Sequence, residues 1–275
     1  MRRGTIELKN HFSALGENGC NPRLDYYLPY NMTEMNRQDQ KRPCILICPG
    51  GGYAMCSQRE AEPIALHFLP LGFNVFVLYY SVPNHHFPTQ LREVAAAYEL
   101  IKQNADEWNC DTEKMGIMGF SAGGHLAAHY SNAWDIPEVR ELFPESHRPF
   151  ASVLCYPVIT ADPNTRHTGS FVNLLGHEPN TDEIERFSCD KLVRDDTPQA
   201  FIWHTAADTI VPVKNSLLYA AALSDHKVPF ELHIYPYGGH GLSTADKHTM
   251  NEVGTNEIHV QNWLCALKKW IGLTF

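Results

Sequence analysis

A five-residue stretch, Gly119-Phe120-Ser121-Ala122-Gly123, constrains the fold of this chain more than any other. It follows the short apolar run 115–118 and precedes a helix-compatible run that begins at Gly124. The pattern predicts a strand, a sharp turn and a helix, with Ser121 at the apex. The flanking glycines let strand and helix approach closely, while the turn strains the serine backbone. We therefore predict a nucleophile elbow, although the same glycines could mark a strand-to-helix turn without chemistry.

The rest of the chain alternates between strand-like and helix-like segments from Cys44 onward. The apolar run 44–48 is continuous, as expected for a strand buried on both faces, whereas 91–104 has apolar residues at helical spacing. This alternation predicts an α/β fold with a mostly parallel central sheet and helices on both faces. Strands are expected at 44–48, 74–79, 115–120, 151–156, 200–204 and 231–235, helices at 62–69, 91–104, 214–223 and 259–270, and an antiparallel pair of strands at 5–8 and 23–28.

Residues 160–197 interrupt this alternation. The segment is rich in Asp, Asn, Gly and Pro and lies between two predicted strands. An insertion at this place predicts a small cap over the site, although a plain surface excursion would have the same composition. A chain of 275 residues is within the range of one α/β domain. We therefore expect a single domain over 1–275, with the insertion at 160–197 as its lid.

Composition and charge argue against several classes of protein. The net charge is −9 and no basic cluster exceeds a few residues, which disfavours binding to nucleic acid. No apolar run approaches the roughly 18 residues of a membrane-spanning helix. Arg2 and Arg3 are not followed by an apolar segment, so a secretory signal is not expected. The eight cysteines form no CxxC pair and lie mostly in apolar contexts, which favours free buried thiols and a cytoplasmic protein.

A glycine-rich loop, Pro49–Tyr53, follows the predicted strand at 44–48. In an open parallel sheet, ligands bind at the carboxyl ends of the strands. Acyl transfer requires hydrogen-bond donors there because negative charge develops on the carbonyl oxygen, and consecutive glycines expose backbone N–H groups. We therefore predict an oxyanion hole formed by Gly51, Gly52 and Ala122, and a substrate contact at Tyr53. The loop has no Gly-Lys-Ser/Thr sequence, which disfavours phosphate binding.

A candidate acid and a candidate base follow two later strands. Asp208 lies in the loop after 200–204, and His240, flanked by glycines, lies after 231–235. The chain order Ser121, Asp208, His240 is the order found in α/β-hydrolases. In such a triad His240 takes the serine proton, while Asp208 fixes the imidazole tautomer and stabilises its charged form. These three residues are our candidate catalytic residues.

Other acids and histidines compete for these roles. Asp195-Asp196 is an alternative acid, but it precedes its strand instead of following it. His125 and His129 lie on one face of the predicted helix after Ser121 and could form a second base or a metal pair. A metal site needs further ligands, and the chain has no H-E-x-x-H sequence, so we expect His125 to be structural and no metal to be bound. His85-His86 is expected near the rim of the site.

Several motifs carry a family resemblance. They are Pro49–Tyr53, Ser57–Glu60, Gly119–Ala127, Asp208–Pro212 and Gly239–Gly241. Together they resemble the acetyl-xylan and feruloyl esterase-type carbohydrate esterases of the α/β-hydrolase superfamily, often described as xylanase-related esterases or sugar hydrolases. The Pro-Gly-Gly-Gly-Tyr and Ser-x-Arg-Glu sequences narrow the resemblance to this branch. Lipase-like relatives have His-Gly-Gly-Gly, and Pro49 stands in the place of their histidine, which argues against the hormone-sensitive-lipase type.

The resemblance implies a serine carboxylesterase that hydrolyses short acyl esters, acetyl in the first place, without a cofactor. The expected partner is a small-molecule ester such as an acylated sugar, and a homodimer is compatible with a chain of this size. A serine peptidase or amidase has the same triad order, so the residues leave that alternative open, although no propeller-sized N-terminal domain precedes the hydrolase motifs. A non-catalytic binder on a hydrolase scaffold is a third hypothesis, against which the intact triad residues count.

Overall fold

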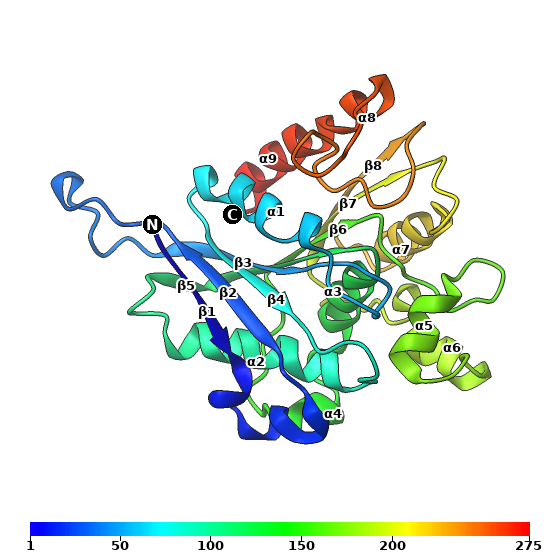
Figure 1. Cartoon of the computed structure of the whole chain (residues 1–275), viewed down its shortest axis with the longest axis horizontal. Coiled ribbons are helices and arrows are strands. Elements are labelled where there is room, and N and C mark those ends of the chain that lie inside the picture. The colour runs from blue at the N-terminus through cyan, green and yellow to red at the C-terminus, as the bar shows by residue number, and fades with distance from the viewer.

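The computed structural model describes residues 1–275, apart from the side chains of residues 17 and 18. A single eight-stranded sheet runs through it in the order β1-β2-β4-β3-β5-β6-β7-β8 (Figure 1). The strands are β1 (Arg2–Glu7), β2 (Arg23–Leu28), β3 (Arg42–Cys48), β4 (Asn74–Tyr79), β5 (Cys110–Phe120), β6 (Ala151–Cys155), β7 (Gln199–Thr205) and β8 (Phe230–Tyr235). The strands from β3 onward are parallel to one another, and β1 and β2 add antiparallel strands beside β4. The predicted α/β class with a mostly parallel sheet is confirmed.

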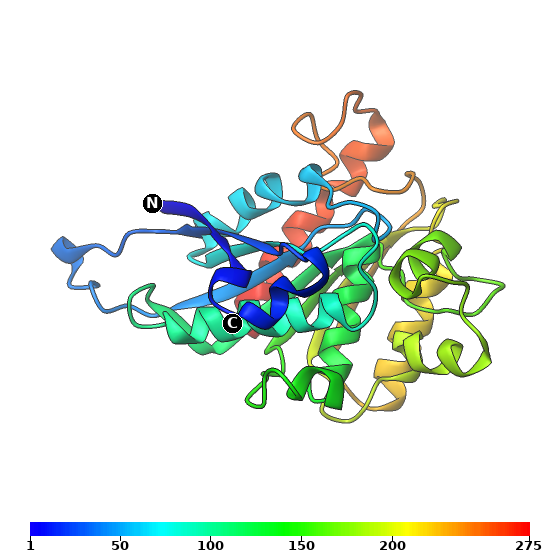
Figure 2. The ribbon, with the colours of Figure 1, turned by 60° about the horizontal axis from the view of Figure 1, so that its bottom comes forward.

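Helices cover both faces of the sheet (Figures 1 and 2). They are α1 (Glu62–Phe68), α2 (Thr89–Gln103), α3 (Ser121–Ala133), α4 (Pro137–Arg140), α5 (Thr168–Leu175), α6 (Thr181–Phe187), α7 (Lys214–Asp225), α8 (Thr255–Val260) and α9 (Asn262–Thr274). On one face α1 and α9 share a core that includes Phe68 and Trp263. On the other face α2, α3 and α7 share a second core that includes Leu126 and Tyr219. Because both faces are covered, the central strands are continuous apolar runs.

Several boundaries differ from the sequence-based expectation: the strand expected at 5–8, for example, is Arg2–Glu7. Two differences are larger. The strand expected at 115–120 begins at Cys110, because polar residues extend it and its register with β3 shifts between Arg42 and Cys44. The helix expected at 259–270 belongs to a longer helical segment, α8 and α9, interrupted at Gln261. Within the described part of the chain, no helix has the length and apolar character needed to cross a membrane.

The segment 160–197 contains α5 and α6 and is anchored to the rest of the structure. Phe171 and Phe187 belong to the same core as α2 and α3. Asn173 Nδ2 donates a hydrogen bond of 2.8 Å to the carbonyl oxygen of Gly52. The segment therefore lies against the glycine-rich loop that follows β3.

Candidate active site

The predicted elbow forms where β5 meets α3. Ser121 is the first residue of α3 and has a φ of 52°, a left-handed conformation that costs about 1–3 kcal/mol in a non-glycine residue. A Cβ atom on Gly119 would lie 2.0 Å from the carbonyl oxygen of Gly123, and one on Gly123 would lie 2.1 Å from that of Cys48. Close backbone contacts therefore require both glycines of the motif.

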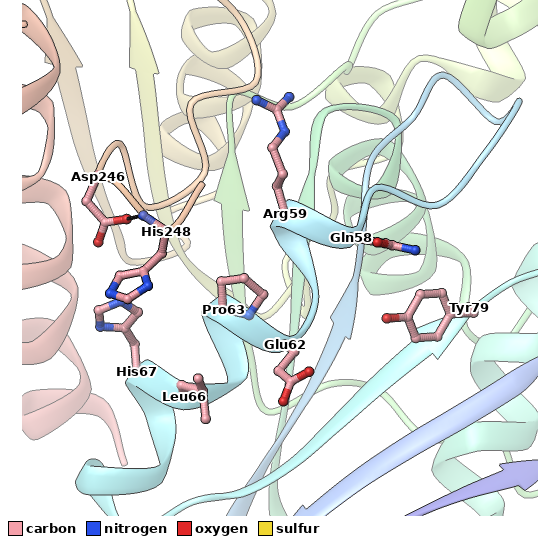
Figure 3. A pocket seen from close by; sticks show the side chains of 9 residues that line it. All are labelled: Gln58, Arg59, Glu62, Pro63, Leu66, His67, Tyr79, Asp246 and His248. Atoms are coloured by element: carbon pink, nitrogen blue, oxygen red, sulfur yellow. Dashed lines mark hydrogen bonds between the residues drawn. The ribbon is translucent and has the colours of Figure 1, made fainter. Parts of the chain in front are cut away.

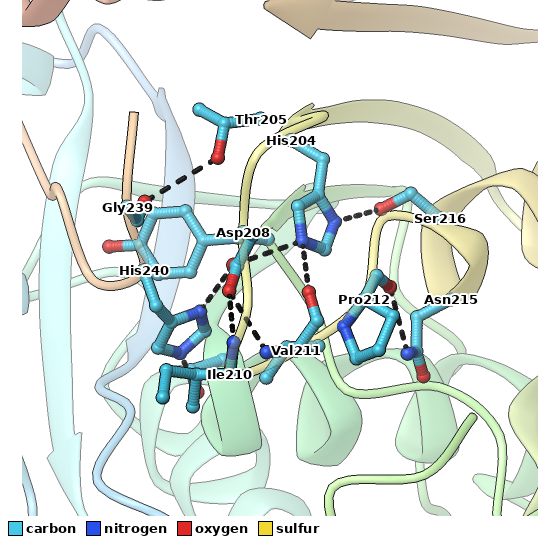
Figure 4. A network of polar contacts seen from close by, with 12 residues as sticks. His204, Thr205, Asp208, Ile210, Val211, Pro212, Asn215, Ser216, Gly239 and His240 are labelled. Atoms are coloured by element: carbon cyan, nitrogen blue, oxygen red, sulfur yellow. Dashed lines mark hydrogen bonds and ion pairs between the residues drawn. The ribbon is translucent and has the colours of Figure 1, made fainter. Parts of the chain in front are cut away.

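Three side chains that are far apart in the sequence meet at this elbow. Ser121 Oγ lies 2.7 Å from His240 Nε2, and His240 Nδ1 lies 2.6 Å from Asp208 Oδ2 (Figure 4). Asp208 comes from the loop after β7 and His240 from the loop after β8. The structure thus places the serine, histidine and aspartate singled out from the sequence in one continuous hydrogen-bonded chain.

Asp208 acts as an acceptor through both carboxylate oxygens. Oδ1 accepts the backbone N–H groups of Ile210 and Val211, each at 2.9 Å. Oδ2 faces His240 Nδ1 and, at 3.2 Å, the Nε2 of His204. Burial by itself would raise the pKa of Asp208, but the hydrogen bonds from His204 and His240 outweigh it and hold this pKa well below its usual range. Asp208 is therefore ionised at neutral pH and can stabilise a charged imidazole.

His204 is a member of this network that sequence reasoning missed (Figure 4). Its ring is completely buried, with Nε2 2.9 Å from the Val211 carbonyl oxygen and Nδ1 2.8 Å from Ser216 Oγ. Because a carbonyl oxygen can only accept, Nε2 carries a proton, and Nδ1 shares a hydrogen bond with the hydroxyl of Ser216. The only sequence signal is a histidine at the end of an apolar strand, four residues before Asp208.

The glycine-rich loop lies beside the elbow. Gly51 and Gly52 have φ values of 129° and 65°, and both line the same cavity as Ser121. Among the described residues, the backbone N–H groups of these two glycines have no hydrogen-bond acceptor. The N–H of Ala122 belongs to the first turn of α3, where backbone N–H groups lack intrahelical partners. The unpaired N–H groups of Gly51 and Gly52 therefore lie at the cavity that holds Ser121, and Ala122 directly follows that serine.

Ser121 and His240 open into a cavity of about 610 Å³. One wall comes from the glycine-rich loop and Met55, and another from the 160–197 segment, through His167 and Asn173. Burial, and then the neighbouring charge of His240, lower the pKa of His167. His167 therefore presents a neutral ring to the cavity at neutral pH, a contribution that sequence reasoning did not identify.

A second cavity, of about 720 Å³, shares Gln58 and Arg59 with the first (Figure 3). The side chain of Gln58 points toward Tyr79, and that of Arg59 points away from both (Figure 3). The Arg59 Nη2 lies beside the histidine loop, since a Cβ atom on Gly241 would be 3.2 Å from it. The adjoining cavities leave room next to Ser121 for a ligand larger than a short acyl group.

The position of Tyr53 corrects one expectation. Its side chain is only 1% exposed and does not line the cavity around Ser121. Its hydroxyl lies 2.9 Å from Nδ1 of His125, whose Nε2 lies 2.9 Å from the Phe187 carbonyl oxygen. Because the ring packs inward beneath the loop, Tyr53 is a structural residue rather than a substrate contact. His125 is likewise structural, and burial lowers its pKa to about 4.

The competing residues lie elsewhere. Asp195 pairs with His226 at 2.8 Å on the surface. His129 is buried, and burial holds its pKa well below the usual value. His86 Nδ1 lies 2.9 Å from the carbonyl oxygen of Asn173, so it contacts α5 instead of Ser121. None of these residues belongs to the hydrogen-bonded chain around Ser121.

The cysteines and the possible metal ligands lie outside the hydrogen-bonded chain around Ser121. All eight cysteines are free. Six are buried, as expected, Cys56 is partly buried, and Cys265 is exposed despite its apolar neighbours, because it lies on the outer side of α9. In the parts of the chain that the structure describes, no cluster of three or more His, Cys, Asp or Glu side chains could hold a metal ion.

Two family profiles match the sequence. The profile named BD-FAE matches residues 24–143, and that of the prolyl oligopeptidase family matches residues 90–264. Among curated proteins, the endo-1,4-β-xylanase B of Butyrivibrio fibrisolvens is 42% identical over 84% of this chain and 37% of that protein. The acetylxylan esterase of Xylanibacter ruminicola is 35% identical over 72% of this chain and 40% of that protein. The chain thus spans about two fifths of the length of these curated relatives.

Solved structures match over nearly the whole chain. The acetyl ester-xyloside bifunctional hydrolase of Caldicellulosiruptor lactoaceticus superimposes with a TM-score of 0.85 and 35% identity, over 98% of this chain and 95% of that one. A sugar hydrolase of Lactococcus lactis gives a TM-score of 0.77 and 34% identity, over 98% and 97% of the two chains. These matches agree with the observed fold.

Proposed function

We propose that this chain, which belongs to the α/β-hydrolase superfamily and to its carboxylic ester hydrolases of the acetyl-xylan and feruloyl esterase type, hydrolyses short-chain acyl esters through an acyl-enzyme on Ser121. The observation that carries the proposal is the continuous chain Ser121 Oγ to His240 Nε2, at 2.7 Å, and His240 Nδ1 to Asp208 Oδ2, at 2.6 Å. A nucleophile that lines a cavity, a base within hydrogen-bond reach and an orienting acid are the groups that acyl transfer needs.

In the first half of the reaction, His240 Nε2 accepts the Ser121 proton as Oγ attacks the ester carbonyl carbon. Negative charge moves to the carbonyl oxygen, where the N–H groups of Gly51, Gly52 and Ala122 can donate to it. The tetrahedral intermediate collapses as His240 returns the proton to the departing alcohol. An acyl-enzyme on Ser121 remains.

In the second half, a water molecule takes the place of the alcohol. His240 Nε2 accepts a proton from this water while its oxygen attacks the acyl carbon, and the same donors hold the developing oxyanion. Collapse expels Ser121 Oγ, which regains a proton from His240, and the carboxylic acid leaves. Asp208 stays ionised throughout and balances the positive charge on the imidazole.

Acetyl esters of sugars or small oligosaccharides are the proposed substrates. Two relatives are named as an acetylxylan esterase and an acetyl ester-xyloside hydrolase. The second cavity next to Gln58 and Arg59 offers space for a carbohydrate alcohol beside the acyl group. The polar side chains of Gln58 and Arg59 favour an alcohol that carries hydroxyl groups over one with a long alkyl chain.

An amidase or peptidase activity is the second candidate, because the prolyl oligopeptidase profile covers residues 90–264. A substrate panel separates the two candidates: p-nitrophenyl acetate, butyrate and octanoate, acetylated xylo-oligosaccharides, and p-nitroanilides of amino acids. We expect the highest kcat/KM for acetyl esters and negligible cleavage of anilides. Rapid cleavage of anilides without turnover of esters would overturn the esterase proposal.

A further inference from the structure

The Ser57–Glu60 motif contains a buried carboxylate that the mechanism above does not use. Glu60 ends the short 3-10 turn at Gln58–Glu60 and its side chain is only 3% exposed. Among the described residues, no Lys, Arg or His lies within ion-pair distance of its carboxylate. Burying a carboxylate without a cationic partner costs free energy. Other contacts of Glu60 must therefore offset this cost.

Glu60 contacts the glycine-rich loop directly. Its Oε2 accepts the backbone N–H of Gly50 at 2.8 Å, and Gly50 immediately precedes the two glycines whose N–H groups face the cavity. A Cβ atom on Gly50 would lie 2.7 Å from Glu60 Oε2 and 2.9 Å from Ser121 Cβ. The carboxylate and the serine therefore flank the same glycine, and the Glu60 contact fixes where this loop sits relative to the elbow.

Through its other oxygen, Glu60 contacts the histidine loop. The hydroxyl of Tyr156 donates to Glu60 Oε1 at 2.6 Å and accepts the backbone N–H of Ser243 at 2.9 Å. Ser243 lies three residues after His240, and its hydroxyl donates back to the Arg59 carbonyl oxygen. The Tyr156 ring packs edge-on against the His240 ring, with 5.1 Å between centroids. One side chain thus joins the loops that carry the oxyanion donors and the base.

The hydrogen bonds and charges around Glu60 favour its ionised form. Both oxygens of Glu60 act as acceptors, one from an N–H and one from an O–H group, which suits the ionised form. Burial raises the pKa of Glu60, while the hydrogen bonds from Tyr156 and Gly50 and the charges of His240 and Arg59 oppose that rise. Glu60 and Asp208 are thus two carboxylates whose pKa values the charge of His240 lowers.

We propose that Glu60 is a positioning residue, which holds the glycine-rich loop in register with the histidine loop and, as an anion, favours the imidazolium form of His240 in the transition state. The inference rests on the proposed function, because it needs a reaction in which His240 gains a proton while an oxyanion forms. Glu60 lies in the lining of the Ser121 cavity, but its two carboxylate oxygens are hydrogen-bonded to Gly50 and Tyr156, so we assign it a positioning role and no proton transfer.

The test compares Glu60→Gln and Tyr156→Phe with the wild-type protein in turnover of p-nitrophenyl acetate across pH. Glu60→Gln keeps the size of the side chain but removes its charge and one acceptor oxygen. We expect kcat to fall roughly 10–100-fold with little change in KM, because a misplaced donor weakens only the transition state. The acidic limb of the kcat/KM profile should also move to lower pH by about 0.5–1 unit, since the loss of an anion disfavours the imidazolium.

Glu93→Gln is the matched control. Glu93 is also a buried carboxylate that accepts a backbone N–H, from Ser81 at 2.7 Å, but it lies on α2 and does not line the cavity. Its variant should leave kcat and the pH profile unchanged. Tyr156→Phe removes the hydroxyl that donates to Glu60 and should also lower kcat. This variant keeps the test decisive if Glu60→Gln fails to fold.

Two outcomes would overturn the inference. Wild-type kcat and an unshifted pH profile in Glu60→Gln would do so, as would a lower melting temperature as its only defect. Failure of the proposed function would look different, because the wild-type protein itself would then turn over no ester. The expected result is an active wild-type enzyme with a selective kcat defect in both site variants.

Discussion

Asp208→Asn is the substitution that probes the hydrogen-bonded chain most sharply. The amide oxygen of asparagine can keep the two backbone hydrogen bonds from Ile210 and Val211 that Asp208 Oδ1 now accepts. Its NH₂ group then replaces Oδ2 and points two protons at His240 Nδ1 and His204 Nε2, both of which now donate to Asp208. His240 must therefore place its proton on Nε2, where it can no longer accept the proton of Ser121.

The size of the effect follows from charge and tautomer together. An ion pair about 4 Å apart, at an effective dielectric constant of about 20, is worth about 4 kcal/mol, and the imidazolium of His240 loses this partner. The wrong tautomer adds to that loss. We expect kcat to fall about 10⁴-fold, which corresponds to about 5 kcal/mol of transition-state stabilisation, while KM changes little.

The assay is steady-state hydrolysis of p-nitrophenyl acetate, with circular dichroism to verify folding. Asp195→Asn is a matched control, because Asp195 also pairs with a histidine Nδ1, that of His226 at 2.8 Å, but on the surface. It should retain wild-type kcat. A folded Asp208→Asn protein with more than about one tenth of wild-type kcat would refute the role that we assign to Asp208.

Two further predictions concern stability. Burial raises the pKa of Glu93 from 4.5 to about 7. The contribution of Glu93 to the free energy of unfolding is therefore complete below about pH 4.5 and is lost as the pH rises through 7. The loss amounts to up to about 3 kcal/mol. Relative to wild type, the melting temperature of Glu93→Gln should therefore increase between about pH 5 and 8, and a constant difference would contradict the assigned shift. A Cβ atom on Gly123 would lie 2.1 Å from the Cys48 carbonyl oxygen, so Gly123→Ala should lose about 1–3 kcal/mol in urea unfolding. Gly272→Ala, which meets no atom within 4 Å, is its control and should lose nothing.

Much of the fold could be predicted from the sequence because both faces of the parallel sheet are covered. Buried strand segments such as 44–48 then appear as unbroken apolar runs. The glycines around Ser121 mark the elbow because backbone atoms fill the space that their side chains would need. Ser121, Asp208 and His240 each follow a predicted strand, which placed the candidate site at the carboxyl ends of the strands. These features depend on local packing, which the sequence records directly.

Other features depend on contacts between distant segments, which the sequence does not record. Glu60 contacts Tyr156 across 96 positions of the chain. His204 is only four positions from Asp208, but it joins the network because the loop after β7 turns Asp208 Oδ2 back toward its ring. The sequence predicts a substrate contact at Tyr53, whereas in the structure Gly51, Gly52 and Tyr53 all have positive φ and the Tyr53 ring is buried in the core. The direction of a side chain in such a loop follows from tertiary packing.

Peptide mass spectrometry can show directly whether an acyl-enzyme forms on Ser121. Wild-type protein and Ser121→Ala are treated with a fluorophosphonate or with a slowly deacylated ester, and then digested. We expect one added group on the peptide that contains Ser121, no added group in Ser121→Ala, and a fall in kcat of roughly 10⁴-fold or more in that variant. Label on another residue, or near wild-type turnover by Ser121→Ala, would contradict it.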